Sequence, residues 1–167
     1  MEGDDDMKKI LVPTDGSDCS ELAIDKAGEL AEKFKSELVL IHVNELPGRS
    51  IFINPVVSDA TPSFFNERTD GPVKTISIPK EYLDNLEKAG QDILDRGKAR
   101  LAEKNVKVSM ATVRGKPADA IIDYVEHNDI DLVVMGSHGM GGFRRFFMGS
   151  VTHKVALSIK KPIMIVR

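Results

Sequence analysis

Short apolar runs alternate with longer amphipathic stretches along this chain. Short, mainly apolar runs at 8–13, 38–43, 132–135 and 163–166 predict strands. Apolar and polar residues instead alternate at 106–112, which is typical of a strand with one exposed face near a sheet edge. The pattern therefore predicts five short strands.

Between the strands, apolar residues recur every three or four positions and predict helices. Ser17 or Asp18 can cap the first helix, and Pro79 and Pro117 open two more. A last helix is expected at about 150–159. We expect the first helix to bury one stripe, made of Leu22, Ala23, Ala27, Leu30, Ala31 and Phe34.

This order of elements predicts an α/β fold: a single-domain, doubly wound, five-stranded parallel sheet of Rossmann-like type with helices on both faces. The expected strand order is 3-2-1-4-5. Ligands bind such sheets beyond the carboxyl ends of the strands, where the strand order reverses. That rule brings residues 13–15, after the first strand, beside Met135 and Gly136, after the fourth.

Two segments do not follow the pattern. Residues 1–7 are predicted to be a disordered leader to a domain that spans 8–167. Residues 44–78 hold four prolines and no sustained period, so we predict a long flexible insertion. A connection of this length is usually a lid or a binding loop, and a mobile surface loop is the alternative.

Composition narrows the classes of function. Of the 167 residues, 41% are hydrophobic, and no apolar run reaches the roughly 20 residues of a membrane span. The acidic start lacks the apolar stretch of a secretory signal, so we expect a cytoplasmic protein with no membrane partner. A net charge of -3 argues against a nucleic-acid partner. A single cysteine, Cys19, excludes an intrachain disulfide.

Residues 136–150 form a glycine-rich loop between the fourth strand and the last helix. Glycines let backbone amides approach a ligand, and free amides at a helix start favour an anion. The Ser150 hydroxyl adds a donor, and Arg144 or Arg145 supplies positive charge. The loop therefore predicts a phosphate site; a turn that serves only backbone geometry is the alternative.

The spacing excludes two familiar phosphate loops. No lysine follows a glycine as a Walker A loop requires. The dinucleotide fingerprint also fails, because Arg144 stands where its third glycine belongs.

The glycines do fit the pattern G-x2-G-x9-G-[ST], as Gly136, Gly139 and Gly149-Ser150. Together with residues 10–17 and 161–163, this pattern resembles the universal stress protein family, in its ATP-binding branch. The resemblance implies that ATP, ADP or AMP contacts a site made of Pro13, Thr14, Asp15, Val43, Met135, Gly136, Gly139, Gly149, Ser150 and Val151.

The resemblance also implies roles. Asp15 would contact the ribose, and any Mg²⁺ would be held mainly by the phosphates with Asp15. Val43 would meet the base through its backbone. The alternative is a purely structural role, in which Asp15 only shapes the turn that leads into the first helix. His138 either faces the ligand or shapes the loop.

Three functions remain open. The first is a stress-response regulator that binds an adenine nucleotide and has no catalytic residues. The second is a slow ATPase or a phosphoryl- or adenylyl-transfer enzyme, although no group in the loop positions water with certainty. The third is an adaptor with an empty site. The apolar last strand, 163–166, would lie at a sheet edge, and we expect a homodimer through it.

Overall fold

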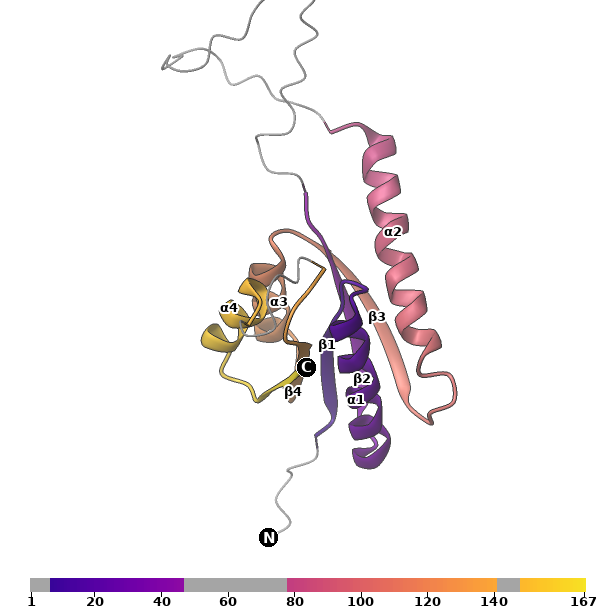
Figure 1. Ribbon diagram of the computed structural model, residues 1–167, viewed down its shortest axis with the longest axis vertical. Helices are drawn as coiled ribbons and strands as arrows, with labels where there is room; N and C mark the ends of the chain where they lie inside the picture. Colours follow the sequence, from indigo (N-terminus) through magenta and orange to yellow (C-terminus); the bar gives the residue numbers. More distant parts are fainter. Residues whose placement is uncertain (1–6, 47–77, 141–147) are drawn as a thin grey trace, which may run out of the picture.

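The computed structural model describes residues 7–46, 78–140 and 148–167. Within them the chain alternates five strands with four helices (Figure 1). The strands are β1 (Lys9–Pro13), β2 (Glu37–Asn44), β3 (Lys107–Arg114), β4 (Leu132–Gly136) and β5 (Ile163–Val166). The helices are α1 (Asp18–Phe34), α2 (Lys80–Ala99), α3 (Pro117–His127) and α4 (Ser150–Ser158).

All strand pairs are parallel, and the order is β3-β2-β1-β4-β5. The predicted fold class and strand order are therefore confirmed. The order reverses between β1 and β4, whose backbones pair at Ile10–Leu132 and Leu11–Val133. The carboxyl ends of these two central strands thus lie side by side.

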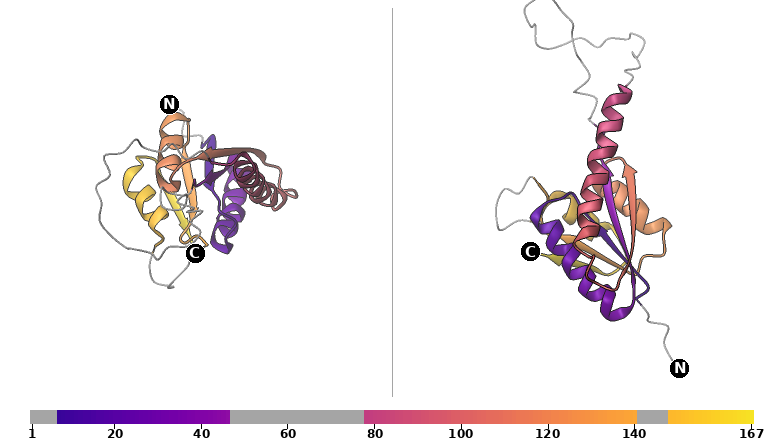
Figure 2. Two further views of the ribbon diagram at one scale, coloured as in Figure 1. Left: turned by 90° about the horizontal axis from the view of Figure 1, so that it is seen from above. Right: turned by 90° about the vertical axis from the view of Figure 1, so that its right-hand side faces the viewer.

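The helices cover both faces of the sheet, α1 and α2 on one side and α3 and α4 on the other (Figure 2). Successive side chains of a strand point to opposite faces, so β1 contributes to two cores. Ile10 and Val12 pack under α1 and α2. Leu11 packs with α3 and α4.

The predicted stripe of α1 is partly wrong. Ala23, Ala27 and Ala31 are buried as expected, but Leu22 is 45% and Phe34 47% exposed. At about 100° per residue, Leu22 lies nearly opposite the centre of the buried face. Phe34 is the last residue of α1, and the chain turns away after it because Lys35 has φ 58°.

The edge position predicted for β3 is confirmed, but its single exposed face is not. Val108 and Met110 pack against one core, while Ala111 and Val113 pack against the other. The exposure of β3 therefore comes from its place at the edge.

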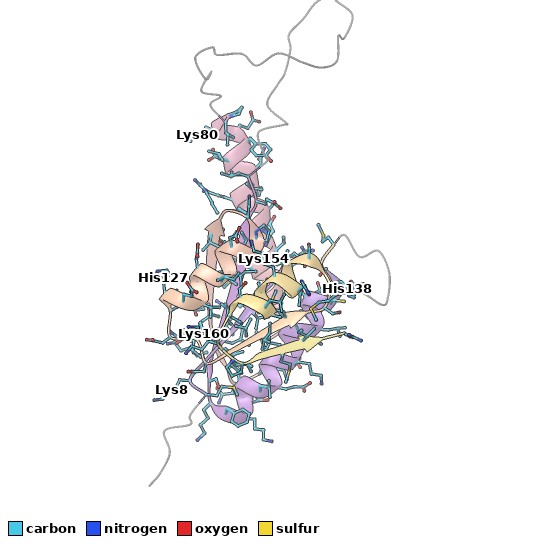
Figure 3. All side chains as sticks on the ribbon, turned by 90° about the vertical axis from the view of Figure 1, so that its left-hand side faces the viewer. Lys8, Lys80, His127, His138, Lys154 and Lys160 are labelled. Atoms are coloured by element: carbon cyan, nitrogen blue, oxygen red, sulfur yellow. The ribbon has the colours of Figure 1, made fainter. Side chains whose placement is uncertain are left out.

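Helix α2 extends beyond the carboxyl edge of the sheet (Figure 1). Lys80, labelled in Figure 3, marks its far end. The buried residues of α2 are Gly90, Leu94 and Gly97, all in its second half. The first half thus has few contacts with the sheet.

Residues 1–6 and 47–77 lie outside the described residues, so the predicted leader and insertion stay predictions. Met7, assigned to the leader, is partly buried against the core under α1. Asn44, assigned to the insertion, is the last residue of β2. In the part of the chain that the structure describes, no helix is long and apolar enough to cross a membrane.

Candidate functional site

Helix α1 begins directly above the end of β4. A Cβ on Gly136 would lie 2.7 Å from the carbonyl carbon of Cys19 and 2.9 Å from the Ser20 nitrogen. Real Cβ atoms essentially never come so close to backbone, so this position requires glycine. The contact fixes the turn after β1 relative to the loop after β4.

Asp15, in the turn after β1, accepts three hydrogen bonds. Ser17 donates twice to Oδ1, from its backbone N–H at 3.0 Å and from its hydroxyl at 2.6 Å. The Met140 N–H donates to Oδ2 at 2.9 Å and reaches across from the loop after β4. Burial alone would raise the pKa of Asp15, but these hydrogen bonds outweigh it and hold the pKa below its usual value.

Gly139 allows this approach of the two loops. A Cβ at this position would lie 2.4 Å from Asp15 Oδ2, so any other residue would force the loops apart. An ionised carboxylate accepts about four hydrogen bonds. The Ser20 hydroxyl also helps to lower the pKa of Asp15. Of the three bonds described, only the one from Met140 reaches Oδ2, so this oxygen keeps acceptor capacity.

The start of α4 lies against the same loop. The Gly149 N–H donates to the Ser137 carbonyl at 2.8 Å, and the Thr152 hydroxyl donates to the Gly136 carbonyl at 2.9 Å. Gly149 is the N-cap of α4, and no side chain caps this helix within the described residues. The first amides of α4 thus begin beside the end of β4 without a side-chain acceptor.

His138 lies between these features, near α4 and far from His127 (Figure 3). Its Nδ1 is 2.8 Å from the hydroxyl of Ser137. Its Nε2 is buried and has no hydrogen-bond partner among the described residues. Burying such a group without a partner costs free energy, so an acceptor or donor is expected to reach it.

Val43 lies on β2, two residues after Ile41, where the pairing of β2 with β1 ends at Pro13–Ile41. The Thr14 carbonyl, which a continued ladder would offer to Val43, instead lies 2.8 Å from His42 Nδ1. A carbonyl only accepts, so this ring nitrogen carries the proton. The backbone N–H of Val43 on the side of β1 is therefore not paired with the Thr14 carbonyl.

The remaining predicted residues are less available. The Thr14 hydroxyl lies 3.1 Å from the Ser20 hydroxyl, and the Thr14 side chain is buried under α1. Met135 is also buried, in the core under α3 and α4. Pro13 pairs with Ile41 as the last residue of β1. Arg144 lies outside the described residues.

The structure thus brings together Asp15, Gly136 and Gly139 with Gly149, Ser150 and Val151. Sequence reasoning missed the Met140 N–H as a partner of Asp15 and His42 as the partner of Thr14. No motif marks either contact, because the first depends on how close two loops come and the second on the pairing of β1 with β2.

The donor set fits a phosphorylated ligand better than a bare metal ion. The described residues contain no group of three histidine, cysteine or acidic side chains able to hold a metal. Uncapped amides favour an anion, and Asp15 offers an acceptor for a hydroxyl. A ligand with both phosphate and sugar hydroxyls satisfies both features.

Comparison with known proteins identifies the family of this chain. A family model described as the universal stress protein family matches residues 7–167. The universal stress protein YxiE of Bacillus subtilis is 31% identical over 163 residues, which cover 95% of this chain and 98% of that protein.

Two solved structures share the fold. Protein MJ0577 of Methanocaldococcus jannaschii superposes with a TM-score of 0.69 at 26% identity, covering 96% of each chain. The universal stress protein of Archaeoglobus fulgidus, solved in complex with dAMP, has a TM-score of 0.62 at 20% identity and covers 96% of this chain and 98% of that one.

Proposed function

Because the chain belongs to the universal stress protein family, we propose that it binds ATP or a related adenine nucleotide and acts as a stress-response regulator. The site is the junction between the ends of β1 and β4 and the start of α4. The dAMP bound to the Archaeoglobus fulgidus protein supports adenine nucleotides as the ligand class.

One observation carries the proposal. The uncapped start of α4 and the carboxylate of Asp15 meet on the same loop, which Gly139 holds against Asp15. A helix start and a carboxylate prefer ligand groups of opposite character, an anion and a hydroxyl donor. A nucleotide carries both, separated by its ribose.

Each residue then has a role. The amides of Gly149, Ser150 and Val151 receive the phosphates, and Gly136 and Gly139 leave room for them. Asp15 accepts from a ribose hydroxyl. The free backbone edge of Val43 pairs with the base, and Pro13, Thr14 and Met135 form the floor under it. Arg144 adds positive charge, and Mg²⁺ enters with the phosphates.

Binding rather than turnover is the activity we propose. A hydrolase needs a group that positions or deprotonates water near the γ-phosphate. Asp15 is committed to three hydrogen bonds, and its lowered pKa makes it a weak base. The ATPase or transferase function stays an alternative, tested by chromatography of ATP after incubation with Mg²⁺.

Calorimetric titration with ATP, ADP and AMP tests binding, with GTP as the control for the base. We expect binding of at least one adenine nucleotide and a loss of binding in Gly149→Val, since a Cβ at 149 would already lie 3.3 Å from the Ser137 carbonyl oxygen and the larger side chain would crowd the loop beside the proposed phosphate position. Analysis of nucleotide released from the denatured, freshly purified protein is an independent measurement. Absence of heat with every adenine nucleotide would reject the proposal and leave the adaptor with an empty site.

We also propose that two copies pair through β5. This strand lies at the sheet edge, and its Met164 is 39% exposed. An apolar edge normally needs cover, and a two-fold pairing of identical strands supplies it. A cytoplasmic location is part of the same proposal.

A further inference from the structure

A pocket lies at the carboxyl edge of the sheet, away from β4 and α4. It has a volume of about 660 Å³ and is bounded by the ends of β2 and β3 and by the middle of α2. This volume is in the range of small-molecule sites. All of its lining residues belong to these three elements.

The floor of the pocket holds an unsatisfied amide. Asn44 is 1% exposed, and neither its Nδ2 nor its Oδ1 has a hydrogen-bond partner among the described residues. Its backbone is satisfied, because its carbonyl accepts from the Gly115 N–H at 3.2 Å. A buried amide without partners is costly, and most such groups in proteins are paired.

Glycine on α2 lies directly above this amide. A Cβ on Gly90 would lie 2.7 Å from Asn44 Oδ1 and 2.8 Å from His42 Cδ2. The backbone of α2 at Gly90 therefore packs directly on the amide. Gly90 is the first buried residue of α2 and lies where the loosely packed first half of the helix meets its packed second half. A shift of this turn would expose the amide to a ligand.

The rim of the pocket carries two charges of opposite sign without ion-pair partners in the described part of the chain. Lys88 and Asp92 lie one turn apart on α2 and both line the pocket. The other two charged lining residues, Glu87 and Arg114, already pair with each other. Among the residues described, the rim thus offers a cation and an anion without ion-pair partners, above an amide without hydrogen-bond partners.

We propose that this pocket binds a small zwitterion that carries an amide, such as a dipeptide. Asn44 presents a donor and an acceptor side by side, which an amide complements with its own carbonyl and N–H. Asp92 pairs with the ammonium group of the ligand and Lys88 with its carboxylate. An uncharged or singly charged ligand would leave one rim charge unmatched.

This pocket and the proposed nucleotide site use different residues at the end of β2. His42 and Asn44 face α2, as their contacts with Gly90 show. Val43, between them, packs with the core under α3 and α4. The proposal therefore does not rest on nucleotide binding, and either site can fail without the other.

Glycylglycine is the probe, added at millimolar concentration to the ¹⁵N-labelled full chain. We expect the Asn44 side-chain amide and the Gly90 N–H to shift with saturation in nuclear magnetic resonance spectra. The Asn44 signal is identified by its loss in Asn44→Asp, and the Gly90 signal by backbone assignment if that variant does not fold. The matched ligand is 5-aminopentanoate, which has the same length and charges but no amide, and it should bind more weakly.

Lys88→Gln and Asp92→Asn should each weaken binding by about 1.5- to fivefold, the effect of losing one exposed ion pair. Lys80→Gln, on the same helix but outside the pocket, is the control and should bind as the parent does. Three results would overturn the proposal: no shift at Asn44 or Gly90, equal affinity for 5-aminopentanoate, or unchanged affinity in both rim variants.

Discussion

The contact between Asp15 and Gly139 shows how single residues shape the proposed nucleotide site. The carboxylate is held by Ser17 on its own turn and by Met140 from the opposite loop. Gly139 lets the second of these bonds form, because no side chain separates the loops. The size of the side chain at position 139 and the charge of Asp15 are therefore expected to affect both the stability of the fold and nucleotide binding.

Gly139→Ala should lower the free energy of unfolding by about 1–3 kcal/mol, since its Cβ would overlap Asp15 Oδ2 and push the loops apart. Nucleotide affinity should fall as well. Urea unfolding and calorimetry measure the two effects. For stability, Gly149→Ala is the control of smaller effect, because its Cβ would lie 3.3 Å from the Ser137 carbonyl oxygen. Equal losses of unfolding free energy in the two variants would contradict the argument.

Asp15→Asn should destabilise the protein at neutral pH by about 1–2 kcal/mol, because an amide nitrogen cannot accept a hydrogen bond. The folded-state pKa of Asp15 is lowered. Its stabilising contribution is thus complete above about pH 4 and is lost as the pH falls through the lower folded-state pKa.

The difference between Asp15→Asn and the parent should therefore shrink as the solution is acidified below about pH 4. Urea midpoints across this range measure it. A difference that stays constant into acid would mean that the charge of Asp15 contributes nothing.

Residues that belong to a sequence motif could be predicted from the sequence. Residues whose role depends on a contact with a distant part of the chain could not. The glycine spacing marked Gly136, Gly139 and Gly149. Asn44 was assigned to the insertion at 44–78, because that stretch holds four prolines and has no sustained period. Only the position of Gly90 above it shows that the amide is buried.

At the scale of elements, glycines also set the distance between helices and sheet. A Cβ on Gly97 of α2 would lie 3.0 Å from Ile24 Cδ1 and 3.2 Å from Leu40 Cδ1. Arg100, just after α2, is hydrogen bonded to Asp25 and Glu21 of α1. The two helices therefore pack as a pair over one face of the sheet.

Gly97→Ala tests this packing. The gain in helix propensity is about 1 kcal/mol, but crowding in a packed core costs about 1–3 kcal/mol. We expect a net loss of stability or no gain in thermal unfolding. An exposed substitution on the same helix, Asp84→Ala, should stay within about 0.5 kcal/mol of the parent. A clear rise in Tm for Gly97→Ala would show that the Ile24 and Leu40 side chains move aside at little cost in free energy.

The elements themselves were largely predictable. Strands covered on both faces leave a continuous apolar signal, and prolines marked the starts of α2 and α3. Leu22 was misplaced because apolarity alone does not place a residue on the buried face when small alanines make the contact. The two faces of β3 could not be foreseen, since they depend on which neighbours reach the sheet edge.

For the whole molecule, the two edges of the sheet differ. The edge strand β3 bears charged residues at both ends, Lys107 and Arg114. The other edge, β5, is apolar throughout. Charges at an edge oppose pairing with another strand, so β5 is the edge suited to a second copy.

Met164→Glu should convert the proposed dimer to a monomer, because the two-fold symmetry brings two new carboxylates into one interface. Sedimentation of the parent and the variant measures this. Tyr82→Glu, an equally exposed site on α2, is the control and should leave the assembly unchanged. A monomeric parent at micromolar concentration, or a dimeric Met164→Glu, would contradict pairing through β5.

Val43 and Asn44 are neighbours in the chain that face opposite sides of β2. If a nucleotide at one side displaces this strand end, the affinity of the other side for its ligand changes by some factor. Thermodynamic reciprocity then requires the second ligand to change nucleotide affinity by that same factor. The last two residues of one strand would thus be enough to let a metabolite signal and the energy state of the cell report on each other.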